Sequence, residues 1–443
     1  MASRVRAVDP LRQFMKRVSN KKARVGVIGL GYVGLPLAVE FAKTGFRVTG
    51  FEIDAKRVAA LKAGRSYIQD VPTREIRDLV STGRLHATLD FDELKSMDAI
   101  EICVPTPLRK TKDPDVSYIV AAVHEIAPRL RRGQLVVLES TTYPGTTDEL
   151  VRPMLEEHGM RAGKDYFLAF SPERIDPGNP KFHTRNIPKV VGGATADCRK
   201  TVSALYGHVF EQVVPVTSTQ VAETVKLLEN TFRSVNIGMV NELALMCDKL
   251  GIDVWEVIDA AATKPFGFMP FYPGPGLGGH CIPVDPFYLS WKARQSGFEA
   301  RFIELAGQVN GSMPYHVARL VGDALNARRK AVRGARVLLL GVAYKANIDD
   351  VRESPSLDLM EILEKEGAHV SYCDPYVPTL RHGGKVLRAV PFRPRSLRAA
   401  DCVVIATAHK DFDFGLVARH ARSIVDCRNS LKGRRRARGV VRL

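Results

Sequence analysis

The sequence predicts an α/β protein with two Rossmann-like, doubly wound parallel-sheet domains joined by a long central helix. Short apolar runs alternate with helical patterns over residues 22–215 and again from residue 335, which is typical of a parallel sheet with helical connections. Between these regions, residues 217–250 carry apolar side chains at steps of three and four without a proline. That period predicts one helix of about 30 residues.

The expected strands alternate with helices along both regions. In the first region they are expected at residues 24–28, 46–51, 98–104, 134–139, 166–170 and 188–192. In the second region they are expected at residues 336–340, 369–374, 401–408 and 422–427, with a helix over 354–366. The strand 336–340 ends at Gly341 much as the strand 24–28 ends at Gly29, so we expect related folds in the two regions.

The net charge of +17 is concentrated at the two ends of the chain. Residues 1–22 contain seven Lys or Arg and one acidic residue, and residues 431–443 contain six Lys or Arg and no acidic residue. A basic end can bind nucleic acid or an anionic membrane. We expect instead a basic N-terminal extension over residues 1–21 and a basic tail over 431–443, both solvated and poorly ordered. We expect no nucleic-acid partner and no membrane partner.

The seven cysteines are dispersed and form no C-x-x-C pair. This usage indicates a reducing compartment and argues against a disulfide framework or a zinc site, so no metal is expected. No apolar run reaches the 18 or so residues of a membrane span, and the N-terminus lacks the apolar core of a secretory signal. These features predict a cytoplasmic protein.

A glycine-rich segment after the first strand indicates a dinucleotide site. The segment is Gly29-Leu30-Gly31-Tyr32-Val33-Gly34, and a helical pattern follows it. The glycines allow a tight turn and a close approach of the backbone to a pyrophosphate at the helix N-terminus. Glu52 ends the second strand, where an acid binds the adenosine ribose hydroxyls. Asp54 is the alternative acid for this role.

An acid at this place favours NAD over NADP, because a carboxylate repels a 2′-phosphate. Arg57 lies nearby and keeps NADP open as the alternative. The segment Val104-Pro105-Thr106-Pro107 follows the next strand of the expected sheet. We expect Pro105 and Thr106 to cover the nicotinamide side of the cofactor.

The other informative segment surrounds one cysteine and runs Gly276-Leu277-Gly278-Gly279-His280-Cys281-Ile282-Pro283-Val284-Asp285-Pro286. Its glycines let the backbone approach a ligand closely and leave Cys281 uncrowded. A cysteine is usually a buried small hydrophobe, which is our interpretation of the other six. For Cys281, the adjacent His280 and Asp285 favour a reactive thiol.

Five separated segments occur in one order along the chain. They are Gly29–Gly34, Ser171–Arg174, Ala222–Asn230, Gly278–Asp285 and Gly341–Pro355. In this order they resemble the UDP-glucose/UDP-N-acetylhexosamine 6-dehydrogenase family, and the resemblance covers residues 22 to 430. Joint occurrence of five motifs is far more specific than a glycine-rich turn alone.

The resemblance implies a four-electron oxidation that consumes two NAD. The first hydride leaves C6 of the sugar and yields an aldehyde, to which Cys281 adds as a thiohemiacetal. A second hydride transfer gives a thioester, which water hydrolyses. The implied catalytic residues are Lys226 at the oxyanion, Asp285 and Glu173 as bases for water, and Thr141 and Asn230 as hydrogen-bonding partners of water or substrate.

The resemblance also implies contacts with the substrate and the cofactor. Besides Glu173, Lys226 and Asn230, the expected substrate-binding residues are Arg174, Lys264, Tyr272, Gly276, Gly278, Gly279, His280 and Lys345. Thr141 and Arg352 are expected near the cofactor.

Four of these residues have alternative interpretations, and for His280 the alternative is a purely structural histidine. Lys226 lies on an otherwise apolar helix and could be a snorkelling lysine. Glu173 could pair with Arg174 or Lys189, and Arg352 could form a surface ion pair with Glu353.

The residues around the cysteine also bear on the sugar. Glucose-type members usually carry Lys where this chain has Val284, and they rarely carry the His280 found here. Both residues favour the N-acetylhexosamine branch, and within it we expect UDP-N-acetylglucosamine. UDP-N-acetylmannosamine and UDP-glucose are the alternatives. The arginine that glucose-type enzymes lend across a subunit interface has no obvious match, and Lys264 is its candidate substitute.

These inferences assign a role to each region. Residues 22–215 are expected to bind NAD, residues 216–320 to form a central helical domain with the active-site loop, and residues 321–430 to bind the UDP-sugar. The long helix is expected to form a homodimer or a higher homo-oligomer. A non-catalytic nucleotide-binding protein and an alcohol dehydrogenase that stops at the aldehyde are the competing functions.

Overall fold

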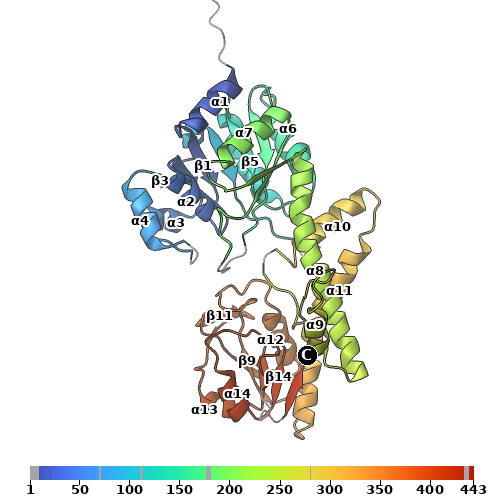
Figure 1. The fold of residues 1–443 in the computed structure, drawn as a ribbon. Coiled ribbons are helices and arrows are strands. Elements are labelled where there is room, and N and C mark those ends of the chain that lie inside the picture. Colours follow the sequence, from blue (N-terminus) through green and yellow to red (C-terminus); the bar gives the residue numbers. More distant parts are fainter. Residues whose placement is uncertain (1–8, 69–70, 110–112, 176–180, 280, 434–438) are drawn as a thin grey trace, which may run out of the picture. The chain divides into compact units, whose positions relative to one another are not determined.

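The computed structural model describes residues 9–68, 71–109, 113–175, 181–279, 281–433 and 439–443. The chain divides into two compact units, one up to Glu229 and one from Asn230 onward. Figure 1 shows the order of the elements along the chain. Within the described ranges, no helix combines the length and apolarity needed to cross a lipid bilayer.

The first unit is built on an eight-stranded sheet with the order β3-β2-β1-β4-β5-β6-β7-β8. All neighbouring pairs are parallel except β6 and β7, which are antiparallel. This order, running outward from β1 in both directions, confirms the doubly wound arrangement. The strands are β1 (Arg24–Ile28), β2 (Arg47–Phe51), β3 (Leu85–Thr88), β4 (Ala99–Ile102), β5 (Leu135–Leu138), β6 (Phe167–Phe170), β7 (Lys189–Gly193) and β8 (Val213–Val216).

Helices cover both faces of this sheet, and each face has its own apolar core. In β5, Leu135 and Val137 join one core, while Val136 and Leu138 join the other. The alternation follows from the pleat, which directs successive side chains to opposite faces. The helices are α1 (Pro10–Ser19), α2 (Gly34–Thr44), α3 (Ala55–Lys62), α4 (Thr73–Ser81), α5 (Ser117–Ile126), α6 (Arg152–Glu156) and α7 (Ala196–Tyr206).

The N-terminal basic segment is largely helical, so the expectation of a solvated end is wrong for residues 10–19. Asp9 caps α1 by accepting a hydrogen bond from the Leu11 backbone, and the helix buries Phe14 and Val18. Phe14 packs against Phe167 of β6 with ring centroids 6.0 Å apart. The basic side chains lie on the other face of an amphipathic helix.

Helix α8 (Thr219–Leu250) is a single helix of 32 residues, as the apolar period predicts, and Figure 1 shows it without a break. It begins in the first unit and continues into the second. The second unit adds α9 (Val254–Ala261), α10 (Asp285–Gln295) and α11 (Arg301–Asn326) before its own sheet. Asn241 of α8 donates a hydrogen bond to Asn310 of α11 at 2.8 Å, which fixes these two helices to each other.

The second unit carries a five-stranded parallel sheet with the order β10-β9-β13-β14-β15. This confirms a second doubly wound fold after the central helix. The elements are β9 (Arg336–Leu340), α12 (Pro355–Lys365), β10 (His369–Cys373), α13 (Pro394–Ala399), β13 (Cys402–Ile405), α14 (Phe414–His420), β14 (Ile424–Asp426) and β15 (Val440–Arg442). Between β10 and α13, β11 (Thr379–His382) and β12 (Lys385–Arg388) form an antiparallel hairpin.

The C-terminal residues form the edge strand of this sheet, so the expectation of a poorly ordered tail is wrong for residues 440–443. Strand β15 pairs with β14 in parallel register. Leu443 is buried, and its carbonyl accepts a hydrogen bond from the Trp255 indole at 2.7 Å. The strand follows a run of arginines whose charge suggests a tail when the sequence is considered alone.

Replacement of Phe14 by Ala tests whether the N-terminal helix belongs to the folded unit. We expect Phe14→Ala to lower the free energy of unfolding by about 3–5 kcal/mol, because it leaves a cavity beside Phe167. Met15→Ala, at the neighbouring exposed position, should change it by about 0.5 kcal/mol or less. Urea unfolding followed by circular dichroism measures both. Equal effects of the two substitutions would contradict burial of Phe14.

Candidate active site

The turn after β1 contains three glycines, and only one of them has empty space where a side chain would lie. Gly29 has φ +88°, and a Cβ on it would lie 2.5 Å from the Cys103 carbonyl oxygen. A Cβ on Gly34 would lie 1.9 Å from the Gly29 carbonyl oxygen. A Cβ on Gly31 would meet nothing within 4 Å. The first and third glycines therefore serve the turn and the packing of α2, and Gly31 leaves space for a pyrophosphate.

Glu52 stands at the end of β2 beside this turn. Its carboxylate is buried and accepts hydrogen bonds from the backbone of Leu30 at 3.2 Å and of Ile53 at 2.9 Å. Arg57 lies 3.2 Å from the same carboxylate. Asp54 instead caps α3 by accepting from the Lys56 backbone at 2.8 Å. Glu52 is thus the better placed of the two acids, and Arg57 is paired with it.

Further along the same sheet edge, Lys189 is buried between two carboxylates. Its ammonium lies 2.7 Å from Glu139 and 3.7 Å from Glu173, and it donates to the Pro172 carbonyl at 3.0 Å. Burial alone lowers the pKa of Lys189, but Glu139 and Glu173 outweigh this and raise it. The ammonium therefore stays charged in the interior and holds the Glu173 carboxylate in place.

Tyr206 of α7 extends this cluster deeper into the core. Its hydroxyl bonds to both Glu139 and Glu101, the latter at 2.7 Å. A phenol has one proton to donate, so the second contact requires a proton on a carboxyl group. Burial raises the pKa of Glu101 well above its usual value, and Glu139 raises it further. The buried cluster thus holds one carboxyl proton beneath the candidate catalytic Glu173.

The candidate base Glu173 has one oxygen fixed by its own loop. Oε1 accepts from the backbone of Arg174 at 2.7 Å and of Ile175 at 2.8 Å. The Arg174 guanidinium pairs with Glu229 of α8 at 2.6 Å and donates to the Pro188 carbonyl. Of the two charged partners suggested for Glu173, Lys189 is present at 3.7 Å, whereas Arg174 contacts Glu173 only through its backbone.

Helix α8 also anchors the loop that follows β5. Glu223 accepts from the backbone of Gly145 at 2.6 Å and of Thr147 at 2.9 Å. Burial raises the pKa of Glu223 to about 7, against these hydrogen bonds, which lower it. The anchored loop begins near Thr141, which is half-buried. On the same helix Lys226 is 8% exposed, which argues against a snorkelling lysine.

In the second unit, the cysteine lies directly before α10. The Cys281 carbonyl accepts from the backbone of Asp285 at 2.7 Å, and its thiol is exposed. Asp285, the first residue of α10, is buried and accepts from the Asn230 amide at 2.5 Å. The structure therefore brings together Asn230 and Asp285, two of the predicted catalytic residues. His280 lies outside the described residues.

The glycines before Cys281 are needed for packing within the protein, and their contact with a ligand stays a prediction. A Cβ on Gly278 would lie 2.5 Å from the Tyr344 Cβ, and a Cβ on Gly279 would lie 2.9 Å from the Tyr344 ring. A Cβ on Gly276 would lie 3.0 Å from Pro355. The cysteine loop therefore rests on the segment that follows β9.

Four predicted ligand-binding residues of the second unit have protein neighbours. Arg352 pairs with Asp350 at 2.7 Å and not with Glu353. Lys345 follows Tyr344 in the same loop and is half-buried. Tyr272 and Lys264 are exposed. Tyr272 donates to Asp259 at 2.8 Å, and Lys264 lies 4.9 Å from the ring centroid of Phe266. Their ligand contacts stay predictions.

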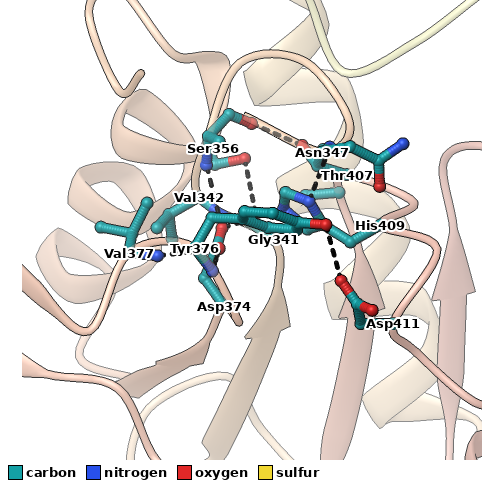
Figure 2. A network of polar contacts seen from close by, with 12 residues as sticks. Gly341, Val342, Asn347, Ser356, Asp374, Tyr376, Val377, Thr407, His409 and Asp411 are labelled. Carbon is teal, nitrogen blue, oxygen red and sulfur yellow. Dashed lines mark hydrogen bonds and ion pairs between the residues drawn. The ribbon is translucent and has the colours of Figure 1, made fainter. Parts of the chain in front are cut away.

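The turn after β9 repeats the geometry of the first turn, and the acid beside it, like Glu52, is hydrogen-bonded within the protein. Gly341 has φ +85°, and a Cβ on it would lie 2.5 Å from the Thr407 carbonyl oxygen. Asp374 follows β10 as Glu52 follows β2. It accepts from the backbone of four residues and from His409 at 3.0 Å (Figure 2). Its lone pairs are thereby used within the protein.

Lys189, Tyr206 and Glu101 are site residues that the sequence patterns alone do not assign. Each lies in a strand or helix whose sequence pattern indicates only a structural role. The cluster also brings together residues more than 100 positions apart in the sequence. Ser140 is a further case, since its hydroxyl accepts from the Val104 backbone at 2.9 Å and so holds the Pro105 loop. A charged or polar residue inside an apolar strand is the only signal of such a role.

The doubly wound sheet, the open Gly31 and the buried Glu52 define the first unit as a dinucleotide-binding domain of the kind found in oxidoreductases. Residues 23–210 match the NAD binding domain of the UDP-glucose/GDP-mannose dehydrogenase family, residues 220–312 its central domain, and residues 338–433 its UDP binding domain. The chain belongs to this family. It is therefore an NAD-dependent nucleotide-sugar dehydrogenase and not a non-catalytic binding protein.

Individual relatives cover nearly the same length. The chain is 38% identical to the UDP-N-acetyl-D-glucosamine 6-dehydrogenase of Pseudomonas aeruginosa, over 88% of this chain and 92% of the relative. It is 36% identical to the UDP-N-acetyl-D-mannosamine dehydrogenase of Pyrococcus horikoshii, over 92% and 96%. A solved structure of the UDP-D-ManNAc dehydrogenase from Pyrococcus horikoshii matches with a TM-score of 0.84 at 34% identity, covering 92% of this chain and 95% of that one.

Loss of the Lys189 ammonium should destabilise the protein in a pH-dependent way. Lys189→Met leaves Glu139 without its partner, so we expect a loss of about 3–5 kcal/mol at pH 8. The pKa of Glu139, already raised by burial, then rises further. The native state retains a proton that the unfolded chain releases, so stability falls as pH rises.

The loss should therefore be smaller at pH 5.5 than at pH 8. Urea unfolding at both pH values measures it, with Lys200→Met as the control because Lys200 is exposed and pairs with Asp197 at the surface. The control should cost about 1 kcal/mol or less. A Lys189→Met penalty that is the same at both pH values would contradict the role of Lys189 in keeping Glu139 ionised.

Proposed function

We propose that the chain oxidises the C6 hydroxymethyl group of a UDP-sugar to a carboxylate, and that the sugar is N-acetylglucosamine. The setting of Cys281 carries this proposal. Its thiol is exposed immediately before α10, whereas the other six cysteines are buried. Cys281 is thus the thiol that a substrate can reach, and a thiol nucleophile is what allows oxidation beyond the aldehyde.

Cys281 supplies the nucleophile in this scheme. Its thiolate adds to the C6 aldehyde, the resulting thiohemiacetal is oxidised to a thioester, and water releases the carboxylate and restores the thiol. NAD, when bound, accepts a hydride from C6 in each of the two oxidations, so each sugar consumes two NAD.

Proton movements fall to two carboxylates and an amine. Asp285 and Glu173 serve as bases toward the water that attacks the thioester. The Asn230 amide, which donates to Asp285 at 2.5 Å, keeps that carboxylate oriented. The Lys226 ammonium stabilises the oxyanion that forms at C6, and Thr141 holds water or substrate by a hydrogen bond.

We further propose which groups hold the ligands. Glu52 binds the adenosine ribose of NAD beside the Gly31 opening, with Pro105 and Thr106 at the nicotinamide side. Lys345 binds the diphosphate of the UDP-sugar as a point charge. The remaining predicted contacts are Arg174, Lys264, Tyr272, the glycines before Cys281, and Arg352 toward the cofactor.

The sugar is the least constrained part of the proposal. Two similar relatives bear names that differ in the sugar, N-acetylglucosamine in one and N-acetylmannosamine in the other. Val284 stands where glucose-type enzymes usually carry Lys, which supports an N-acetylated sugar. Glucose and N-acetylmannosamine are the alternatives. We also propose the cytoplasm as the compartment, since none of the seven cysteines forms a disulfide.

Stoichiometry and one substitution test the covalent scheme. The wild-type chain should release two NADH for each UDP-N-acetylglucosamine consumed. The rate of NADH release should be lower with UDP-N-acetylmannosamine and with UDP-glucose. Cys281→Ser should reduce formation of the uronic acid by at least about 10³-fold, because no thioester can form. NADH absorbance together with product mass spectrometry measures both quantities.

Cys402→Ser, in a buried strand of the second unit, serves as the matched control and should retain two NADH for each sugar. A wild-type ratio of one NADH would identify an alcohol dehydrogenase that stops at the aldehyde. Full turnover by Cys281→Ser would show that this thiol is not the nucleophile.

We propose that the functional unit is a homodimer formed through α8. Phe232, Met239 and Met246 are spaced by seven residues and are 47%, 55% and 51% exposed. Residues at this spacing share one helix face, and a seven-residue apolar repeat is the seam by which two helices pack. A second copy of α8 is the occupant that matches this repeat, because it presents the same stripe.

A charge in this stripe should disrupt the dimer. We expect Met239→Glu to raise the dissociation constant by about 100-fold or more, since association would bury an unpaired carboxylate. Sedimentation velocity over a concentration series measures the shift. Arg233→Glu is the control, because Arg233 is exposed and lies about 100° around the helix from Phe232. An unchanged mass distribution for Met239→Glu would exclude α8 as the interface.

A further inference from the structure

The loop between β9 and α12 packs against the glycine-rich segment that precedes Cys281, residues 276–279, which we call the cysteine loop. Tyr344 of this loop fills the space beside Gly278 and Gly279. The Arg352 carbonyl accepts a hydrogen bond from the Gly279 backbone at 3.0 Å. Lys345, the proposed diphosphate ligand, follows Tyr344 directly. The conformation of residues 341–352 therefore bears on both the nucleotide contact and the position of Cys281.

Residues that follow β13 hold this loop at three points, and Figure 2 shows the one between Asn347 and His409. The Thr407 hydroxyl donates to the Ala343 carbonyl at 2.7 Å. The Asn347 backbone donates to His409 Nδ1 at 2.9 Å. The Asn347 side chain accepts from the Lys410 backbone at 2.9 Å. Asn347 has φ +67°, a left-handed conformation that asparagine adopts more readily than most residues with a side chain.

The contacts of His409 define its tautomer. A backbone N–H can only donate, so Nδ1 is the acceptor for Asn347 and carries no proton. Nε2 then carries the proton and donates to Asp374 at 3.0 Å. The ring is fully buried and faces Tyr376 with centroids 5.0 Å apart, while the Tyr376 hydroxyl bonds to Asp411 at 2.6 Å. Phe412 lies on another side with centroids 5.5 Å away.

We propose that His409 is a positioning residue for substrate binding. Through Nδ1 it accepts a hydrogen bond from the Asn347 backbone and so holds Asn347 in the left-handed conformation. This keeps Lys345, and Tyr344 that packs against Gly278 and Gly279, in the arrangement that binds UDP. The inference rests on the proposed function, because it takes Lys345 as a diphosphate contact and Cys281 as the nucleophile. Asp374 anchors the ring from the other side through Nε2 at 3.0 Å.

Two isosteric substitutions separate this role from a purely structural one. In His409→Gln, the amide reaches the position of Nε2 and can still donate to Asp374, but no acceptor faces Asn347. In His409→Asn, the amide oxygen stands near Nδ1 and can accept from Asn347, while the bond to Asp374 is lost. Each variant thus retains one of the two bonds of the ring, so both should lose stability to a similar degree.

Calorimetric titration with UDP alone, without sugar, is the main measurement. We expect His409→Gln to weaken UDP binding about tenfold, the effect of losing one hydrogen bond that holds the site. His409→Asn should stay within about threefold of the wild type, although its melting temperature falls as well. KM for the UDP-sugar should rise in His409→Gln with a smaller change in kcat. Affinities that fall equally in both variants, or in neither, would overturn the inference.

A second pair covers the case in which the histidine variants do not fold. Thr407→Val removes the hydroxyl bond to Ala343 at nearly constant volume, and Thr407→Ser retains it. We expect weaker UDP binding in the valine variant and near wild-type binding in the serine variant, whereas equal binding in the two would overturn the positioning of this loop. If the wild-type chain fails to bind UDP, the proposed function itself is wrong, and the inference fails with it.

Discussion

Each α/β unit depends on one backbone turn that a residue with a side chain cannot make. Gly29 and Gly341 both have positive φ angles, and a Cβ on either would lie 2.5 Å from a carbonyl oxygen in the loop after the adjacent strand. In the first unit the turn leads directly into α2, which begins at Gly34, whereas in the second unit a loop separates Gly341 from α12, which begins at Pro355. Because parallel strands all end at the carboxyl edge of a sheet, the side chains that follow them converge there. The candidate sites of both units lie at this edge for that reason.

The first unit tolerates several charges inside its core because they compensate one another. Lys189 neutralises Glu139 and lies near Glu173, while the Tyr206 hydroxyl contacts one oxygen each of Glu101 and Glu139. An unpaired charge in this position would be expensive, and a paired one gains little stability over an apolar core. The benefit of the cluster is therefore orientation, since it fixes a carboxylate at the sheet edge on a rigid strand framework.

Periodic patterns in the sequence predict most of the elements but few of the contacts. The apolar runs place β1, β9 and the 32-residue α8 within a residue or two, because each buries a continuous face that the pattern displays. Helix α1 is missed because its charge conceals the pair Phe14 and Val18, one turn apart. The three-residue β15 is too short for any period and derives its stability from β14.

Site residues that lie in a short motif can be predicted from the sequence. Contacts between residues that are distant in the sequence cannot. Glu52, Cys281 and Asp285 lie within short motifs and are found by spacing. Contacts such as Asn230 with Asp285, or Gly278 with Tyr344, join residues 55 or more positions apart, and no local pattern encodes them. This explains why the tyrosine that packs against the glycines near Cys281 cannot be found from their motif alone.

The saturated carboxylate of Asp374 has an evolutionary implication. Two units with the same turn and the same acid position are what duplication of a nucleotide-binding fold would leave behind. A copy can abandon its original ligand and keep its fold if the orphaned acid acquires an internal donor, and a single histidine after β13 is sufficient for that. The freed loop is then available for another ligand, so divergence of the two halves requires no change in topology.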